Sequence, residues 1–377
     1  MKRIKVLHLQ PEYNVKPFDV SDLEEQINKA FPVERFEVVN CFLMKRSETD
    51  IHESRAERTV YLNLQHRDFR GLRLKMIWAV WQLLRRETFD VVLCHRYKPS
   101  SVMMHLQRWV NNPQCISVIH SFSDYKPRSR RKLLSKLETS DKWHFITVSE
   151  PLRQHLLGLQ TGFTEDNTTS ITNAIDVVKA RQIQLSRGKA RQVLGLPERA
   201  RIIGTVGRLV SVKGHRYLIE AFAKVQPEFP GIILVIIGEG EERSSLEQLI
   251  DHYQLVDKVY LLGAVEGAVC YVRAFDIWTM PSLSEGLGLA LLEGMSGKLP
   301  CIGSDIPALK PLLNGAGGES CPPADADALA ECLARYLAMT DEQLDCKGQL
   351  AYEYIIRHHS ITDFRNAYLQ LVEKIAC

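Results

Sequence analysis

The sequence predicts an α/β protein built from two doubly wound domains. Short runs of apolar and β-branched residues alternate with amphipathic helical stretches, which is the pattern of parallel β-α-β units. The chain has 377 residues, and this length favours two domains over one. Hydrophobic residues make up 45% and charged residues 25% of the chain, which is typical of globular proteins and excludes the disordered, collagen-like and membrane-embedded classes.

Ten apolar runs are expected to form the strands of the two sheets. Those of the first half are residues 4–9, 36–41, 91–94, 117–120 and 145–148. Those of the second half are residues 201–206, 232–237, 258–262, 277–280 and 300–302. Amphipathic stretches between these runs, such as 20–31 and 72–86, predict helices that cover the sheets.

The domain boundary is expected where the chain becomes polar, basic and poor in strand formers, over residues 176–201. We therefore expect an N-terminal domain at 1–177 and a C-terminal domain at 178–355, with 178–200 as a linker region. Residues 340–377 read as consecutive helices, and we expect the last of them, 356–377, to pack back toward the N-terminal domain.

The charge is unevenly divided between the two halves. The chain carries a net charge of +3, yet residues 1–175 hold 27 Lys and Arg against 20 Asp and Glu. The remaining residues hold 21 against 25. A basic first half predicts an anionic partner, for which nucleic acid, phospholipid and phosphorylated sugar all qualify, while solvated charged faces remain the alternative.

Cysteine usage and the N-terminus predict a reduced protein of the cytoplasm. The nine cysteines are odd in number and form no CxxC pair, and His358 and His359 have no cysteine at metal-ligand spacing. We therefore predict no metal. Lys2 and Arg3 precede a strand-like run rather than a signal-peptide core, and no apolar run reaches the ~18 residues of a spanning helix.

The first candidate site follows the run 201–206 and reads Gly207-Arg208-Leu209-Val210-Ser211-Val212-Lys213-Gly214. In open α/β sheets, ligands bind beyond the carboxyl ends of the strands. Glycines at a strand end open the backbone to a ligand, and the following helix start favours an anion. Arg208 offers a planar fork to phosphate oxygens and Lys213 a point charge. A basic turn exposed to water is the alternative.

The second candidate site follows the run 277–280 and contains two carboxylates, Glu285 and Glu293. We expect Ser284 to cap a helix, with Gly286 and Gly288 opening its first turn. Eight residues are about two helical turns, so Glu285 and Glu293 are expected to share one face and to grip hydroxyl groups of a long ligand. The alternatives are capping for Glu285 and a structural ion pair for Glu293.

The pair Glu285 and Glu293 resembles the E-x7-E motif of the retaining GT-B glycosyltransferases of family 4, which include glycogen-synthase-like and lipopolysaccharide-core enzymes. The segment GRLVSVKG is similar to the phosphate loop of that family. Further similar segments occur in family order and extend over nearly the whole chain: FDVVLCH (89–95), VIHSF (118–122), ITVSEPLR (146–153), ITNAIDV (171–177) and VIIGEGEER (235–243).

The resemblance implies two Rossmann-like domains that face a cleft, with the C-terminal domain binding a nucleotide-sugar, commonly a UDP-sugar. It implies that Arg208 and Lys213 hold the diphosphate and that Glu293 binds the ribose hydroxyls. The donor sugar would be held by Glu285, by the backbone of Gly286, Leu287 and Gly288, and by His120. Gly207 would let the donor approach the loop. A packed strand-end histidine is the alternative for His120, and His95 occupies a similar position.

The resemblance also implies transfer without a metal ion or another cofactor. Asp325-Ala326-Asp327 looks like the D-x-D pattern of metal-dependent enzymes, but it opens a late helix and reads as a cap. Arg208 and Lys213 would stabilise the charge on the leaving diphosphate instead. Retention is usually explained by front-face attack, and no carboxylate stands out as a covalent nucleophile.

The acceptor is expected to be anionic and bound by the N-terminal domain. Five cations of a basic segment are the candidates for contact with it or with an anionic membrane: Lys126, Arg128, Arg130, Arg131 and Lys132. With the stretch 72–86 they suggest a protein on the inner face of the cytoplasmic membrane acting on a lipid-linked saccharide such as lipopolysaccharide core. Ordinary sheet-covering helices are the alternative, and nucleic acid is not expected.

The sequence departs from the family at the end of the first strand. The family often has a Gly-Gly loop there, whereas this chain has Gln10-Pro11-Glu12-Tyr13-Asn14. This departure touches none of the core motifs. Two other functions remain open: a non-catalytic GT-B protein that binds nucleotide-sugars, and a sugar-nucleotide epimerase of the same architecture.

Overall fold

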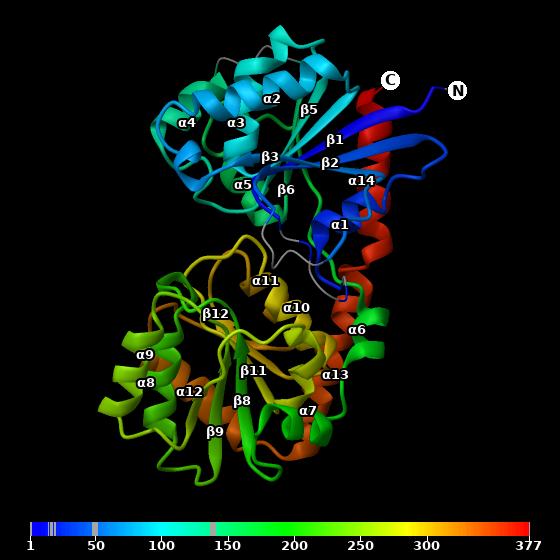
Figure 1. The fold of residues 1–377 in the computed structure, drawn as a ribbon. Helices are drawn as coiled ribbons and strands as arrows, with labels where there is room; N and C mark the ends of the chain where they lie inside the picture. Colours follow the sequence, from blue (N-terminus) through cyan, green and yellow to red (C-terminus); the bar gives the residue numbers. More distant parts are fainter. Residues whose placement is uncertain are drawn as a thin grey trace. The chain divides into compact units, whose positions relative to one another are not determined.

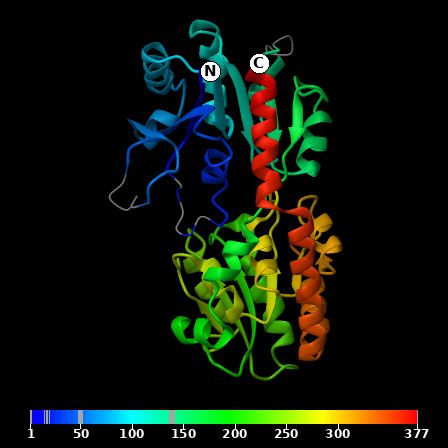
Figure 2. The same ribbon diagram turned by 90° about the vertical axis from the view of Figure 1, so that its right-hand side faces the viewer.

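The computed structural model describes residues 2–13, 15, 18, 20–46, 52–135 and 141–376. The chain forms two compact units (Figures 1 and 2). Unit 1 comprises Met1–Asn173 and Ile361–Cys377, and unit 2 comprises Ala174–Ser360. The chain thus returns to unit 1 through its last helix, α14 (Ile361–Ala376), which contacts α1 (Leu23–Asn28).

Unit 1 contains a seven-stranded parallel sheet with the order β3-β2-β1-β4-β5-β6-β7. Its strands are β1 (Ile4–Gln10), β2 (Phe36–Met44), β3 (Arg58–Leu64), β4 (Val91–His95), β5 (Gln114–Ile119), β6 (Trp143–Thr147) and β7 (Thr168–Ser170). Its other helices are α2 (Leu74–Arg86), α3 (Tyr97–Leu106), α4 (Arg128–Leu134) and α5 (Glu150–Leu157), with short 3-10 turns at His66–Phe69 and Gln107–Trp109. The strand order reverses between β1 and β4, which pair in parallel.

Unit 2 contains a six-stranded parallel sheet with the order β10-β9-β8-β11-β12-β13. Its strands are β8 (Arg201–Val206), β9 (Ile232–Ile237), β10 (Val259–Leu261), β11 (Ile277–Met280), β12 (Cys301–Ser304) and β13 (Glu319–Cys321). Its helices are α6 (Val177–Ile183), α7 (Arg187–Leu194), α8 (His215–Val225), α9 (Arg243–His252), α10 (Leu289–Ser296), α11 (Lys310–Gly315), α12 (Ala326–Leu337) and α13 (Asp341–His358), with 3-10 turns at Ser211–Lys213 and Ala268–Ala274. Each unit is therefore a doubly wound α/β domain, which confirms the predicted fold class.

All ten predicted strands are present, and three further strands were missed. The missed strands are β3, β7 and β13, and each lies at an edge of its sheet. Most residues of β3 are only partly buried, and β7 and β13 are three residues long. Edge strands are covered less fully than central ones, so they do not need the apolar run that identifies a buried parallel strand.

The stretch expected as a linker folds as α6 and α7 within unit 2. Arg191 of α7 is 1% exposed and donates from Nη2 to Asp276 Oδ2 over 2.7 Å, and from Nε to the carbonyl of Ala274 over 2.8 Å. These bonds satisfy a buried guanidinium and fix α7 to the start of β11. Polar composition at 178–200 therefore reflects one anchored buried cation and an exposed helix face rather than an unstructured connection.

The core of unit 2 forms between the sheet and amphipathic helices. Leu218 and Phe222 of α8 are fully buried against Leu234 of β9, and Leu333 of α12 joins the same cluster. Helix α12 begins as predicted, because the carboxylate of Asp325 accepts a hydrogen bond from the Ala328 N–H over 2.9 Å. The loops that follow the strands of this packed sheet carry the candidate site.

Candidate functional site

Three loops of unit 2 meet at the carboxyl ends of adjacent strands. They follow β8, β9 and β11, which are neighbours because β8 pairs with both others. The N–H of Leu209 donates to the Glu239 carbonyl over 2.9 Å, which joins the β8 and β9 loops. The N–H of Leu283 donates to the Val212 carbonyl over 2.8 Å, which joins the β8 and β11 loops. The two motifs of the sequence therefore form one surface at the edge where α/β sheets bind ligands.

Glycines allow these loops to approach so closely. Gly214 has φ 68°, and a Cβ at this position would overlap the carbonyl oxygen of Pro281. Gly240 packs in the same manner against the carbonyl of Leu209. Only a residue without a side chain fits where backbone meets backbone, and a positive φ adds a second reason at Gly214. Gly238 and Gly240 belong to the segment 235–243, which resembles the family. The sequence did not predict that they pack against residues 207–214, which we call the phosphate-type loop.

An ion pair connects the two predicted motifs. Lys213 Nζ donates to Glu285 Oε1 over 2.6 Å, although the two residues are 72 positions apart in the chain. Their side chains are 20% and 11% exposed, so the pair is largely shielded from water. Each group keeps the other charged in a partly buried position, where an unpaired charge would be costly. Arg208 is exposed on the same loop, and its guanidinium has no ion pair with a described residue.

Helix α10 begins later than predicted. Its first residue is Leu289, and the preceding Gly288 has φ 103° and no side chain to cap the helix. The prediction that Ser284 caps this helix is therefore wrong, and Glu285 lies in the loop before it. Glu293 is half-buried within α10, so the two carboxylates do not share a helix face as expected.

The reason for the later start is the tight path of the loop at 286–288. A Cβ at Gly288 would overlap the Leu309 side chain, and Leu287 is buried, so tertiary packing sets this path. Gly286 is half-buried beside Glu285. Glu285 therefore lies in a loop rather than in a helix that starts at Ser284, and in this loop its side chain contacts Lys213.

His215 is a positioning residue that the sequence did not reveal. Its Nε2 lies 3.2 Å from the Arg208 carbonyl, and the ring is buried beneath Gly207. Burial is the main reason that the pKa of His215 falls from 6.5 to about 4, so the ring is neutral near pH 7. Its Nδ1 is buried with no hydrogen-bond partner among the described residues, which makes protonation there costly. The neutral ring donates to the carbonyl and holds the loop in place.

This histidine predicts a loss of stability in mild acid. Between pH 6.5 and about 4 the unfolded chain protonates His215 while the folded chain does not, so the free energy of unfolding decreases as the pH falls through this window. The slope for one group is at most about 1.4 kcal/mol per pH unit. Thermal unfolding from pH 7.5 to 4.5 should show a shallower decrease for His215→Gln than for the wild type. The same change at the exposed His252 should leave the wild-type slope, and a His215→Gln slope equal to the wild type would contradict this role.

His120 lies in unit 1, directly after β5. Its Nε2 is 2.9 Å from His95 Nδ1, and its N–H donates to Asp124 Oδ2 over 3.3 Å. Glu24 Oε1 lies 3.8 Å from His95 Nδ1. Burial lowers the pKa of both histidines, so both are neutral and one donates to the other. Glu24, His95 and His120 bring their ligand atoms within 4.8 Å of one another, a spacing that a divalent cation could occupy.

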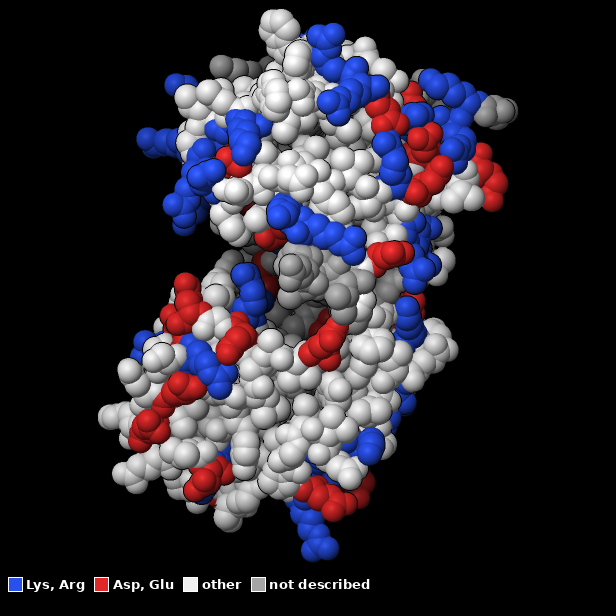
Figure 3. Space-filling model, viewed as in Figure 1, with Lys and Arg blue, Asp and Glu red and all other residues white. Residues whose placement is uncertain are grey.

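The basic segment of unit 1 is partly engaged in the fold. Arg128, Arg131 and Lys132 lie on α4, whereas Lys126 precedes it, and Lys136 falls outside the described residues. Arg130 donates from Nη1 to the Asp124 carbonyl over 2.7 Å and lies 4.4 Å above the Tyr97 ring. Figure 3 shows Lys and Arg side chains gathered over the side of unit 1 that carries α3 and α4. None of the described helices has both the length and the apolar character needed to cross a membrane.

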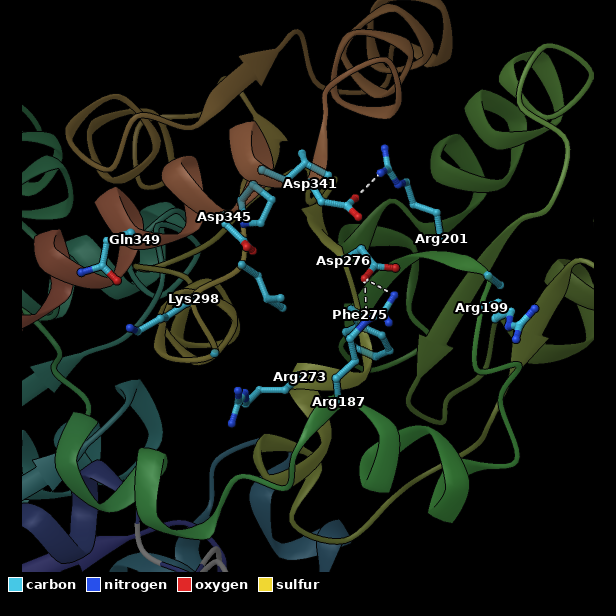
Figure 4. Close-up of a pocket in the computed structure, with 15 residues that line it drawn as sticks. Arg187, Arg199, Arg201, Arg273, Phe275, Asp276, Lys298, Asp341, Asp345 and Gln349 are labelled. Carbon is cyan, nitrogen blue, oxygen red and sulfur yellow. Dashed lines mark hydrogen bonds and ion pairs between the residues drawn. The ribbon is translucent and has the colours of Figure 1, made fainter.

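A cavity of about 700 Å³ in unit 2 lies at the amino ends of the strands, opposite the candidate site (Figure 4). Arg201, Asp276 and Pro300 line it at or just before the first residues of β8, β11 and β12. Two ion pairs lie in its lining, because Asp276 binds Arg187 at 2.9 Å and Arg201 binds Asp341. This cavity therefore contains none of the loop residues and lies away from the ligand-binding edge of the sheet.

Two family models match the chain in consecutive order. Residues 32–179 match glycosyltransferase family 4, and residues 186–349 match the glycosyl transferases group 1. The second match contains all the candidate residues of unit 2, from Gly207 to Glu293.

Three curated relatives share moderate identity with the chain. A D-inositol 3-phosphate glycosyltransferase of Corynebacterium urealyticum is 26% identical, over 76% of this chain and 71% of the relative. The Escherichia coli enzyme UDP-Gal:alpha-D-GlcNAc-diphosphoundecaprenol alpha-1,3-galactosyltransferase is 26% identical, over 62% of each chain. A lipopolysaccharide core biosynthesis glycosyltransferase of Rhizobium meliloti is 28% identical, over 48% of this chain and 52% of the relative.

Solved structures share the fold along its whole length. Sucrose-phosphate synthase of Thermosynechococcus elongatus superposes with a TM-score of 0.82 at 21% identity, covering 98% of this chain and 99% of that chain. The Anabaena protein HepE in complex with UDP-glucose has a TM-score of 0.82 at 16% identity, covering 99% and 100%. The two units together thus make up the GT-B fold, and the chain, which carries a glycosyltransferase family 4 domain followed by a glycosyl transferases group 1 domain, is a glycosyltransferase.

Proposed function

We propose that this glycosyltransferase moves a hexose from a UDP-linked donor to an anionic, lipid-linked saccharide of the cell envelope, with retention of configuration and without a metal ion. Lipopolysaccharide core is the acceptor that we favour. The observation that carries the proposal is the contact between Lys213 and Glu285, which unites the phosphate-type loop and the loop of the E-x7-E motif on one surface.

The residues of unit 2 can perform the donor half of this reaction. A diphosphate would bind Arg208 and Lys213 at the amino end of α8, where cations and the helix dipole favour negative charge. Glycosyl transfer develops charge on the leaving diphosphate, and fixed cations aimed at that charge stabilise the transition state. Lys213 already lies against Glu285, which would bind donor-sugar hydroxyls, so diphosphate and sugar would be held side by side. Glu293 would bind the ribose. His120 stays a prediction from the family resemblance.

The names of similar proteins support the choice of donor and acceptor. HepE was solved with UDP-glucose, and the E. coli relative uses UDP-Gal. The acceptors that the relatives' names give are a phosphorylated inositol and a diphospholipid-linked sugar, and both are anionic. Unit 1 carries the basic segment Lys126, Arg128, Arg130, Arg131 and Lys132, which suits such an acceptor or the anionic inner face of the cytoplasmic membrane.

A donor panel tests the proposal directly. The protein is incubated with UDP-, GDP-, ADP- and TDP-linked hexoses, and free nucleotide is followed with and without a lipopolysaccharide extract. We expect acceptor-dependent release of UDP and an α-linked product from an α-linked donor. Binding of nucleotide without turnover of any donor would favour a non-catalytic protein, and an altered sugar on an intact nucleotide would favour an epimerase.

Chelation should leave the activity unchanged. Because Arg208 and Lys213 supply the positive charge for the diphosphate, EDTA is expected to leave the transfer rate within about twofold of the untreated enzyme. The Glu24, His95 and His120 group is the place in the described residues where a bound ion could contradict this expectation. Metal analysis of the purified protein, with the rate after EDTA and after added Mg²⁺ or Zn²⁺, checks it. A loss of transfer that a metal restores would refute metal independence.

A further inference from the structure

A cationic cavity lies at the ligand-binding edge of unit 1. Its volume is about 370 Å³, which lies within the range of small-molecule sites, roughly 300–1,000 Å³. Glu12, Met44, Arg96 and Asp124 line it, and they lie at or after the carboxyl ends of β2 and of β1, β4 and β5. Since β1 and β4 are the pair where the strand order reverses, the cavity occupies the switch point at which doubly wound sheets bind ligands.

The cations of this cavity exceed its carboxylates. Four cations line it, namely Arg70, Arg96, Lys98 and Arg130, against the two carboxylates of Glu12 and Asp124. The excess of two positive charges equals the charge of a phosphate monoester near neutral pH, whereas a carboxylate ligand would leave one positive charge unbalanced. The lining therefore matches a phosphate group better than a singly charged anion.

The two carboxylates lower the formal charge of the lining, but among the described residues they form only one ion pair with its cations. Asp124 directs Oδ2 to the N–H of His120 rather than to a guanidinium. Glu12 lies 3.6 Å from Arg96, but both side chains are about half exposed, so this pair is weak. Among the described residues, no carboxylate lies within ion-pair distance of Arg70, Lys98 or Arg130. Three of the four cations thus remain available to an anion.

The cations also repel one another. Partial desolvation lowers the pKa of Lys98, and the charges of Arg73, Arg130 and Arg70 lower it further, although Glu12 opposes them. Packing against aromatic rings holds two cations in position: Lys98 lies 5.2 Å from the Phe69 ring and Arg130 lies 4.4 Å from the Tyr97 ring. An anion that binds between like charges offsets their repulsion by its attraction to each of them.

The backbone at the cavity is strained in a way that suits a ligand site. Arg96 has φ 65° and ψ 170°, a conformation that is costly for a residue with a side chain. This conformation lets the chain turn directly from β4 into α3, so that the first turn of α3, with Tyr97 and Lys98, faces the cavity lining. The positive end of the helix dipole adds to the charge of the side chains there.

We propose that this cavity binds a phosphate group carried by a saccharide, with Arg70, Arg96, Lys98 and Arg130 as its ligands. The inference rests on the proposed function in one respect: the phosphorylated saccharide is the acceptor of transfer. Glu12 and Asp124 lie in the same lining, where they can accept hydrogen bonds from sugar hydroxyls. These residues differ from those expected on sequence grounds, because only Arg130 belongs to the basic segment.

Binding is tested on the full-length protein without a donor, by calorimetry with glucose 6-phosphate, glucose and inorganic phosphate. We expect glucose 6-phosphate to bind at least about tenfold more tightly than glucose, and Lys98→Gln and Arg70→Gln each to weaken it about tenfold. Lys98→Arg should retain binding. Arg108→Gln removes an exposed cation outside the cavity and should bind as the wild type does. Thermal unfolding verifies that each variant is folded.

Equal affinity for glucose and glucose 6-phosphate, or equal binding by Lys98→Gln and the wild type, would overturn the proposal. A second arm uses phosphatidylcholine vesicles with and without phosphatidic acid, and vesicle binding that needs Lys98 while glucose 6-phosphate does not bind would assign the phosphate to a lipid and overturn the saccharide. The binding measurement contains no donor, so it does not depend on transfer. If glucose 6-phosphate binds here but no nucleotide-sugar is turned over in the donor panel, the proposed transfer is refuted and the cavity is not. Transfer without preference for a phosphorylated sugar would refute the cavity alone.

Discussion

Lys213→Ala should reduce the rate of transfer by about 100- to 1,000-fold while the protein remains folded. Removal of one preorganised group that stabilises charge in a transition state commonly costs this much, about 3–4 kcal/mol. The affinity for UDP should fall as well, because Lys213 would contact the diphosphate in the ground state. Steady-state kinetics and titration with UDP measure the two effects separately. Arg216→Ala is the matched control, since this cation lies three residues later, is exposed and pairs with Glu220 on α8.

Glu285→Gln should distinguish the role of Glu285 in transfer from the role of Lys213 in binding UDP. Glutamine keeps the size of the side chain but removes the charge, so we expect transfer to fall about 10- to 100-fold, the worth of a hydrogen bond to a charged group. Binding of UDP should be retained or tightened, because Lys213 loses its internal counter-ion and becomes free for the diphosphate. Glu220→Gln is the control. Wild-type transfer rates in Lys213→Ala or Glu285→Gln would refute the assigned roles, and weaker UDP binding in Glu285→Gln would refute the competition between carboxylate and diphosphate.

Gly214→Ala is expected to disrupt the loop that carries Arg208 and Lys213. A methyl group there meets the Pro281 carbonyl oxygen, and φ 68° adds strain of about 1–2 kcal/mol for a residue with a side chain. The β8 loop must therefore move away from the β11 loop, which breaks the contact between Lys213 and Glu285. We expect a lower midpoint of thermal unfolding and a loss of most transfer activity.

The matched control for this change is Gly195→Ala. Gly195 has φ 67°, and a Cβ there would meet nothing within 4 Å, so it shares the backbone strain without the overlap. Gly195→Ala should cost only the strain and should leave transfer and UDP binding at wild-type levels. If the two substitutions were equally mild, close packing of the two loops would not be the reason for a glycine at position 214.

Most strands and both candidate loops of this protein could be predicted from local sequence patterns. The central strands of both sheets are buried on both faces, so each needs an apolar run that can be recognised. The loops after β8 and β11 could be identified from their residue types. A strand end that carries glycine with arginine, lysine or glutamate indicates an anion or hydroxyl ligand, whatever the order of the strands in the sheet. The edge strands β3, β7 and β13 escaped notice because an edge imposes no such requirement.

Contacts between distant segments were decided by the tertiary structure. Lys213 and Glu285 meet because β8 and β11 are neighbours, and the order of strands in a sheet is not written in any local pattern. Packing at Gly288 and Leu287 moved the start of α10 past Glu285, against the capping signal at Ser284. The cationic cavity of unit 1 likewise gathers residues between 11 and 130, and of its four cations only Arg130 belongs to the basic segment that the sequence indicated. The sequence by itself determined which residue types could attract an anion, and the sheet topology decided which of them lie together, because electrostatic attraction depends on distance in space and not on distance along the chain.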